Sequence, residues 1–62
     1  MKDIHYVDAG GVRWHEIFSQ SREALKDKQN YYEQKGYKCW LFPYSLTEYV
    51  LSVQENEAPL LV

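Results

Sequence analysis

Few side chains in this 62-residue sequence are suited to catalysis or metal binding: one cysteine and two histidines. Cys39, with His5 or His15 as its base, would form the thiol–imidazole pair of a nucleophilic enzyme. A catalytic cysteine needs a partly exposed, electropositive setting that lowers its pKa. Cys39 instead lies in the apolar stretch 37–43, and free cysteine is among the most buried residue types. The sequence therefore predicts a core cysteine, no catalytic residue and no enzyme.

The histidines do not form a recognisable metal site either. His15 and Glu16 are neighbours in the sequence, so on a strand they point to opposite faces. If Val7 pairs with Val12 in a hairpin, His5 and His15 fall one residue out of register and also lie on opposite faces. Glycine-rich phosphate-binding motifs are absent from the sequence, and so short a chain can hardly enclose a pocket of about 300 Å3. We therefore expect no metal, no cofactor and no small-molecule substrate.

The length allows one domain at most. A chain this short buries only about 60% of the surface of its unfolded form, and one cysteine cannot form an internal disulfide. Its stability must come from a dense core or from a partner, and the aromatic content of 16% suits either. We expect a single α+β domain over residues 1–55. Residues 56–62 form a C-terminal tail, whose Leu60–Val62 segment could dock on the protein itself or on a partner.

The N-terminal residues contain no apolar signal-peptide segment, and no apolar run reaches the roughly 18 residues needed to cross a bilayer. A lone cysteine is typical of a reducing compartment. These features predict a cytoplasmic protein with no membrane contact.

A helix over residues 22–35 is the clearest element in the sequence. These residues are good helix formers without proline or glycine, and the hydroxyl of Ser19 or Ser21 can cap the free amide groups of the first turn. Gly36 follows where a left-handed residue commonly ends a helix, which would bring Tyr37 back onto Tyr32.

Strands are expected on both sides of this helix. Residues 4–7 and 12–18 flank the turn sequence "DAGG" and predict a hairpin. Its core face would carry His5, Val7, Val12, Trp14 and Phe18. Residues 37–43 predict a buried strand with Tyr37, Cys39 and Leu41 on one side and Lys38, Trp40 and Phe42 on the other.

The last element has two interpretations. As a strand, residues 47–54 alternate well, and the β preference of Tyr49, Val50 and Val53 favours this interpretation. As a helix, "SLTE" is a capping-box pattern that begins at Ser45. The fold class is therefore α+β, a small antiparallel sheet with one helix packed on a face. The element order is ββαββ, with ββαβα as the alternative.

Aromatic side chains exceed what one short helix can cover, and this excess favours a protein-binding function. Interface cores are enriched in Tyr, Trp and Phe, and binding hot spots favour Trp, Tyr and Arg. We expect a non-enzymatic module that inhibits or adapts a larger macromolecule, or binds a second copy of itself. The size would suit an inhibitor encoded by a virus or a mobile element. The expected contact residues are Trp14, Trp40, Phe42, Tyr44 and Tyr49, with Glu48, Glu55 and Glu57 attracting the partner.

A nucleic-acid-binding regulator is the alternative function. An aromatic sheet can stack bases, and the helix carries the basic residues Arg22, Lys26, Lys28 and Lys35. However, the acidic residues Glu23, Asp27 and Glu33 alternate with these basic residues along the helix, and the sequence pI is about 5.5. Nucleic-acid-binding domains usually have a basic stripe and a high pI, so the sequence favours a protein partner.

Overall fold

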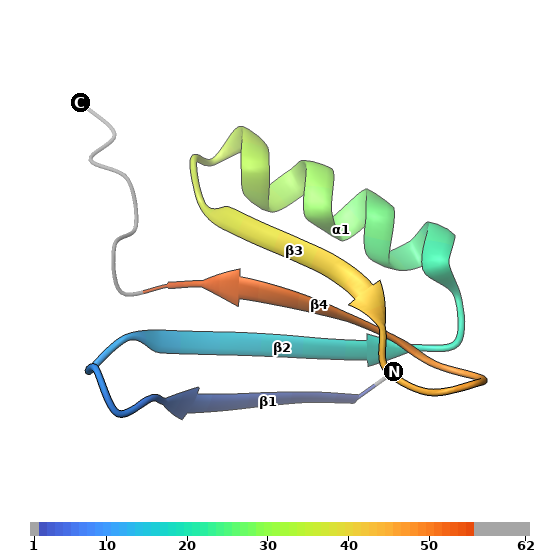
Figure 1. Cartoon of the computed structure of the whole chain (residues 1–62). Helices are drawn as coiled ribbons and strands as arrows, with labels where there is room; N and C mark the ends of the chain where they lie inside the picture. The colour runs from blue at the N-terminus through green and yellow to red at the C-terminus, as the bar shows by residue number, and fades with distance from the viewer. Residues whose placement is uncertain (1, 56–62) are drawn as a thin grey trace.

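The computed structural model describes residues 2–55, which form a four-stranded sheet and one helix (Figure 1). The elements are β1 (Lys2–Val7), β2 (Arg13–Ser19), α1 (Arg22–Gln34), β3 (Lys38–Pro43) and β4 (Tyr49–Gln54). The strands pair antiparallel in the order β1-β2-β4-β3. This arrangement confirms the predicted α+β class and the ββαββ order, in which the last element is a strand. The predicted tail 56–62, with Glu57 and Leu60–Val62, lies outside the described residues.

The two ends of α1 form as the sequence predicts. The hydroxyl of Ser21 caps the N-terminus by accepting from the Ala24 amide at 3.1 Å. At the other end Gly36 has a φ of 91°, a conformation that costs a glycine little. This conformation lets the amide of Tyr37 donate to the carbonyl of Tyr32 at 3.0 Å. Helix length is therefore fixed by local chemistry at both ends.

The core lies between α1 and one face of the sheet, called here the covered face. Leu25 of α1 packs against Ile17 of β2 and against Leu51 and Val53 of β4. Around these buried side chains pack five partly buried ones: Tyr32, Tyr37, Cys39, Leu41 and Tyr49. Among the described elements, α1 contacts β2, β3 and β4, whereas β1 contacts only β2. The helix therefore leaves the β1 side of the covered face open.

The predicted register of the β1–β2 hairpin is wrong by one residue. Val7 pairs with Arg13, because the carboxylate of Asp8 accepts from the amides of Gly10 and Val12 and so holds residues 8–12 in the turn. A shift of one residue exchanges the faces of one strand relative to the other. Correspondingly, His5 now pairs directly with His15.

The predicted core face of this hairpin is also wrong. Ile17 and His15 of β2 are the side chains buried beside α1. Trp14 and Phe18 lie on the opposite face, since alternate residues of a strand point to opposite sides. The aromatic side chains of β2 therefore do not pack under the helix.

The capping-box sequence at Ser45 forms a turn instead of a helix. Its hydroxyl accepts from the amides of Thr47 and Glu48 at 3.3 and 3.2 Å, and the carbonyl of Glu48 accepts from the amide of Tyr44. This turn joins β3 to β4. Within residues 2–55, no helix combines the length and the apolar character needed to cross a bilayer.

Candidate functional site

The sheet face opposite α1 is not covered by any described element and is called here the open face (Figure 1). The strand register places its side chains in three rows across the sheet. From β3 to β1 these rows are Lys38, Gln54, Trp14 and Tyr6; Trp40, Ser52, Glu16 and Ile4; and Phe42, Val50, Phe18 and Lys2.

Five of these twelve side chains are aromatic: Tyr6, Trp14, Phe18, Trp40 and Phe42. Trp40 and Phe42 are each 46% exposed although both stand on a strand of the sheet. The ring of Trp14 lies 5.7 Å from that of Trp40. At the other end, the exposed ring of Tyr44 meets Phe18 edge-on at 4.8 Å. Aromatic rings therefore stand in all three rows of the open face, and they make two contacting pairs. Phe18, Val50 and Ser52 of this face are themselves buried.

A carboxylate lies in the middle row of this aromatic surface. One oxygen of Glu16, Oε2, accepts from the hydroxyl of Tyr6 at 2.9 Å and from that of Ser52 at 3.0 Å. The hydrogen bond to Glu16 favours the protonated phenol and raises the pKa of Tyr6 above its ordinary value. The negative charge of Glu16 is therefore held in place on the open face.

Trp14 is held in place by the hairpin turn. Its indole N–H donates to the carboxylate of Asp8 at 2.9 Å, and the same carboxylate accepts from the amides of Val12 and Gly10. The bond from Trp14, followed by those from these amides, lowers the pKa of Asp8. One aspartate thus fixes both the turn and an aromatic ring of the open face.

The structure brings together four of the partner-binding residues expected from the sequence. Trp14, Trp40 and Phe42 lie on the open face, and Tyr44 follows β3 and packs on Phe18. The other three described residues lie elsewhere. Tyr49 packs against the core on the covered face, Glu48 is in the turn before β4, and Glu55 lies next to the histidines.

Three open-face residues were missed by the sequence reasoning: Tyr6, Glu16 and Phe18. Their signal is the period-two alternation along β1 and β2, which shows which residues of one strand share a face. It does not show which face of β1 matches which face of β2. The register supplies that information, and the register was predicted incorrectly.

The basic helix of the alternative function lies on the other side of the sheet from the aromatic rings (Figure 1). The Nζ atom of Lys35 lies over the Tyr31 ring, 5.1 Å from its centroid. A strand of nucleic acid stacked on the open face would therefore not reach the basic residues of α1.

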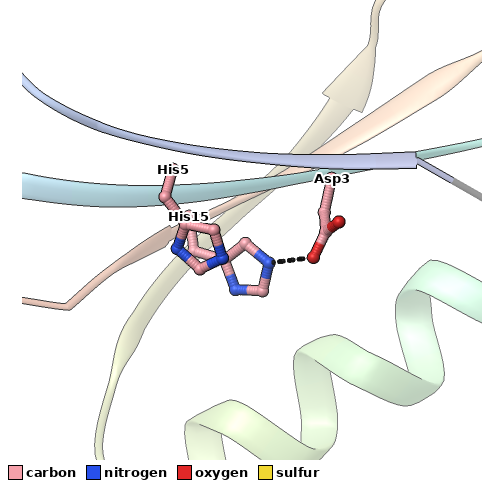
Figure 2. A group of neighbouring side chains, drawn as sticks. All are labelled: Asp3, His5 and His15. Carbon is pink, nitrogen blue, oxygen red and sulfur yellow. Dashed lines mark hydrogen bonds and ion pairs between the residues drawn. The ribbon is translucent and has the colours of Figure 1, made fainter.

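The pairing of β1 with β2 creates a second polar cluster on the covered face, beside the helix (Figure 2). The rings of His5 and His15 stack with their centroids 4.0 Å apart and their planes 14° apart. Nε2 of His15 lies 2.9 Å from a carboxylate oxygen of Asp3. Ligand atoms of Asp3, His5 and His15 all lie within 4.8 Å of one another, so these residues could hold a metal ion.

Cys39 has the setting of a core thiol. It packs against the core from β3, and its Sγ lies 3.8 Å from the carbonyl oxygen of Tyr37. Burial raises the pKa of Cys39 to about 11. This is opposite to the direction that an activated nucleophile requires.

Comparisons of the chain with protein-family models, with curated proteins and with solved structures find no match. The open face and the histidine cluster are therefore interpreted from their own chemistry.

Proposed function

We propose that the protein is a non-enzymatic protein-binding module that uses the open face to inhibit or adapt a larger macromolecule. The observation that carries this proposal is the group of aromatic side chains Trp14, Trp40, Phe42 and Tyr44, over which no described helix or strand lies. Trp40 and Phe42 are each 46% exposed and Tyr44 is 61% exposed. Large apolar surfaces exposed on a small protein mark interaction sites, and Trp and Tyr are the residues most often found at binding hot spots.

The charge of Glu16 favours a different protein as the partner over a second copy. A two-fold dimer formed by the open faces brings the same surface of both subunits together. Glu16 stands in the middle row of that surface, whereas its two lysines, Lys38 and Lys2, stand at opposite corners. Like charges placed together at an interface cost several kcal/mol. A partner that presents a basic side chain among apolar ones would instead pair with Glu16.

One further acidic residue, Glu48, supports a basic partner. It lies just before β4 and has the same charge as Glu16. Glu55, which was also expected to attract the partner, lies beside the histidines of the covered face. Such charges accelerate the encounter with a partner of opposite sign more than they tighten the final complex. We also propose a cytoplasmic location, supported by the free thiol of Cys39.

The experiment compares three tagged proteins: wild type, Phe42→Glu, and Tyr31→Glu as a control. Tyr31 is an exposed aromatic residue of α1, 56% exposed against 46% for Phe42, so the control places the same charge on the other side of the sheet. Each protein is used for capture from lysate with and without nuclease. The captured protein is then purified, and its affinity for all three is measured by calorimetry.

We expect a nuclease-resistant complex whose affinity falls about thirtyfold or more in Phe42→Glu, the scale of a hot-spot residue, and stays unchanged in Tyr31→Glu. Circular dichroism checks that both variants are folded. The proposal fails if both variants bind the purified partner as tightly as wild type does. It also fails if nuclease removes all bound material, or if the wild type is a dimer in solution that Phe42→Glu dissociates.

A further inference from the structure

We infer that Asp3, His5 and His15 bind a single divalent transition-metal ion of the zinc class, with Glu55 supporting the two imidazoles. The inference does not rest on the proposed partner-binding function, because the side chains of this site lie on the covered face of the sheet (Figure 2). Imidazole nitrogen and carboxylate oxygen are both ordinary zinc ligands.

The fold places the three ligands on two adjacent strands. His5 and His15 are direct cross-strand partners, and Asp3 is two residues from His5 on the same face of β1. Side chains of directly opposed residues stand about 5 Å apart at Cβ, and diagonal ones remain within reach of long side chains. The helix does not contact β1, so it leaves this group open along one side.

The distances between the ligand atoms are already close to those of a metal site. In a tetrahedral zinc site with bonds of about 2.1 Å, neighbouring ligand atoms are about 3.4 Å apart. Here they lie within 4.8 Å of one another, and Nε2 of His15 is already 2.9 Å from Asp3. His15 is the fixed ligand, with 11% of its side chain exposed. Asp3 and His5, at 57% and 60%, are free to move toward it.

The stacked rings must separate when the ion binds. The nitrogen lone pairs of an imidazole lie in the plane of its ring, and lone pairs of two nearly parallel rings whose centroids lie 4.0 Å apart cannot both point at one ion. His5 is the ring that can turn, because it is exposed and belongs to the strand that α1 does not cover. Metal binding therefore exchanges the His5–His15 stack for coordination, and this change can be observed directly.

Glu55 is placed to orient both imidazoles. Its carboxylate oxygens lie 3.5 Å from Nδ1 of His5 and 3.9 Å from Nδ1 of His15. These distances are longer than a hydrogen bond, and Nε2 of His15 now shares its proton with Asp3. When a metal ion replaces that proton, a small approach of Glu55 lets it accept from Nδ1, the arrangement of many zinc sites. Together the carboxylates of Asp3 and Glu55 balance the charge of a divalent ion.

A hollow next to the cluster gives an ion access to it. Its volume is about 290 Å3 and its lining is Lys2, Asp3, His15, Ile17, Lys28 and Tyr32. Of the two lysines, Lys28 comes from α1 and opposes a cation, so the carboxylates must outweigh its charge. The Nζ atom of Lys2 lies over the Phe18 ring on the other face of the sheet, 5.1 Å from its centroid. Replacing Lys28 by Gln should therefore tighten metal binding, a result that no purely structural role of the cluster would produce.

The test titrates Zn2+ into the full chain without a histidine tag, by calorimetry near neutral pH in a buffer that does not bind metals. Variants His5→Gln and Asp3→Asn remove one exposed ligand each. Asp27→Asn is the matched control, because Asp27 is an exposed aspartate on α1. Cys39→Ala tests whether the thiol is a ligand. NMR signals of the two imidazoles report the loss of the stack.

We expect one Zn2+ per chain and a shift of both imidazole signals. His5→Gln and Asp3→Asn should each weaken binding at least about tenfold, Glu55→Gln by a similar factor, and Lys28→Gln should tighten it. Asp27→Asn and Cys39→Ala should bind as wild type does. The inference is overturned if wild type binds no Zn2+, if Cys39→Ala abolishes binding, or if His5→Gln and Asp3→Asn, both folded by circular dichroism, bind Zn2+ unchanged.

Discussion

The two faces of this sheet are both rich in apolar side chains. The side chains differ in size between the faces, and only one face is covered by the helix. The covered face buries compact aliphatic groups, Ile17, Leu51 and Val53, under a single helix. The open face carries broad aromatic rings, and Trp40 and Phe42 remain nearly half exposed. The comparison teaches that tight packing and exposed aromatic area are separated in this small domain: the helix closes the core on one face, whereas Trp40 and Phe42 stand outside the core on the other.

The largest effect that can test this separation is the loss of a covered side chain. Leu51 is fully buried, so Leu51→Ala should cost about 2–5 kcal/mol of the free energy of unfolding. For a chain of this length the whole free energy of unfolding is roughly 3–9 kcal/mol. Phe42→Ala removes a larger but half-exposed ring and should cost less than about 1 kcal/mol. Urea denaturation followed by circular dichroism measures both values, and equal losses would contradict the separation.

The reactivity of the Cys39 thiol measures how well the helix shields the covered face from solvent. With a pKa of about 11 against an ordinary 9.0, its thiolate fraction at pH 8 is about a hundredfold smaller than that of a free cysteine. We therefore expect iodoacetamide to alkylate Cys39 about a hundredfold more slowly in the folded protein than in urea. Mass spectrometry after timed quenching gives both rates. Rapid alkylation of the folded chain would mean that the covered face is not closed, and would reopen the case for a reactive thiol.

The smallest expected effect concerns Asp8, which holds Trp14 on the open face. Because the folded state lowers its pKa, Asp8 contributes stability that is present above the ordinary aspartate pKa, near pH 4, and is lost as the pH falls through the folded value. In a Trp40→Phe background, the fluorescence of Trp14 should therefore change as the solution is acidified below about pH 4. Asp8→Asn should abolish this change, whereas Asp27→Asn should retain it. The same acid transition in both variants would show that other groups hold Trp14.

Local signals in the sequence are sufficient to predict the helix and to predict which residues of the later strands share a face of the sheet. Ser21 and Gly36 act on their own neighbours, so their roles do not depend on the rest of the fold. The alternation in β3 correctly separates Cys39 and Leu41 from Trp40 and Phe42, because a single strand fixes which of its residues share a face.

The register of the hairpin and the position of the histidines could not be predicted in the same way. The turn sequence allows more than one pairing, and the carboxylate of Asp8 decides between them by accepting two backbone amides. A one-residue difference was enough to conceal the His5–His15 pair. Ser45 shows the same limit: its hydroxyl accepts the same kind of bonds in a turn as at a helix start, and the pairing of β4 with two neighbouring strands selects the turn.

Of the described elements, β1 contacts β2 and no other, and this has a thermodynamic consequence. An edge strand held by one ladder opens as a local unit at a lower free energy than the centre of a sheet, and its amides exchange hydrogen sooner. Opening of β1 separates His5 from His15 and at the same time removes Ile4 and Tyr6 from the aromatic surface. A ligand that joins β1 to β2 on either face makes this opening more costly. A metal ion bound to the histidine cluster and a partner bound to Ile4 or Tyr6 of the open face would therefore each raise the affinity for the other through the same strand.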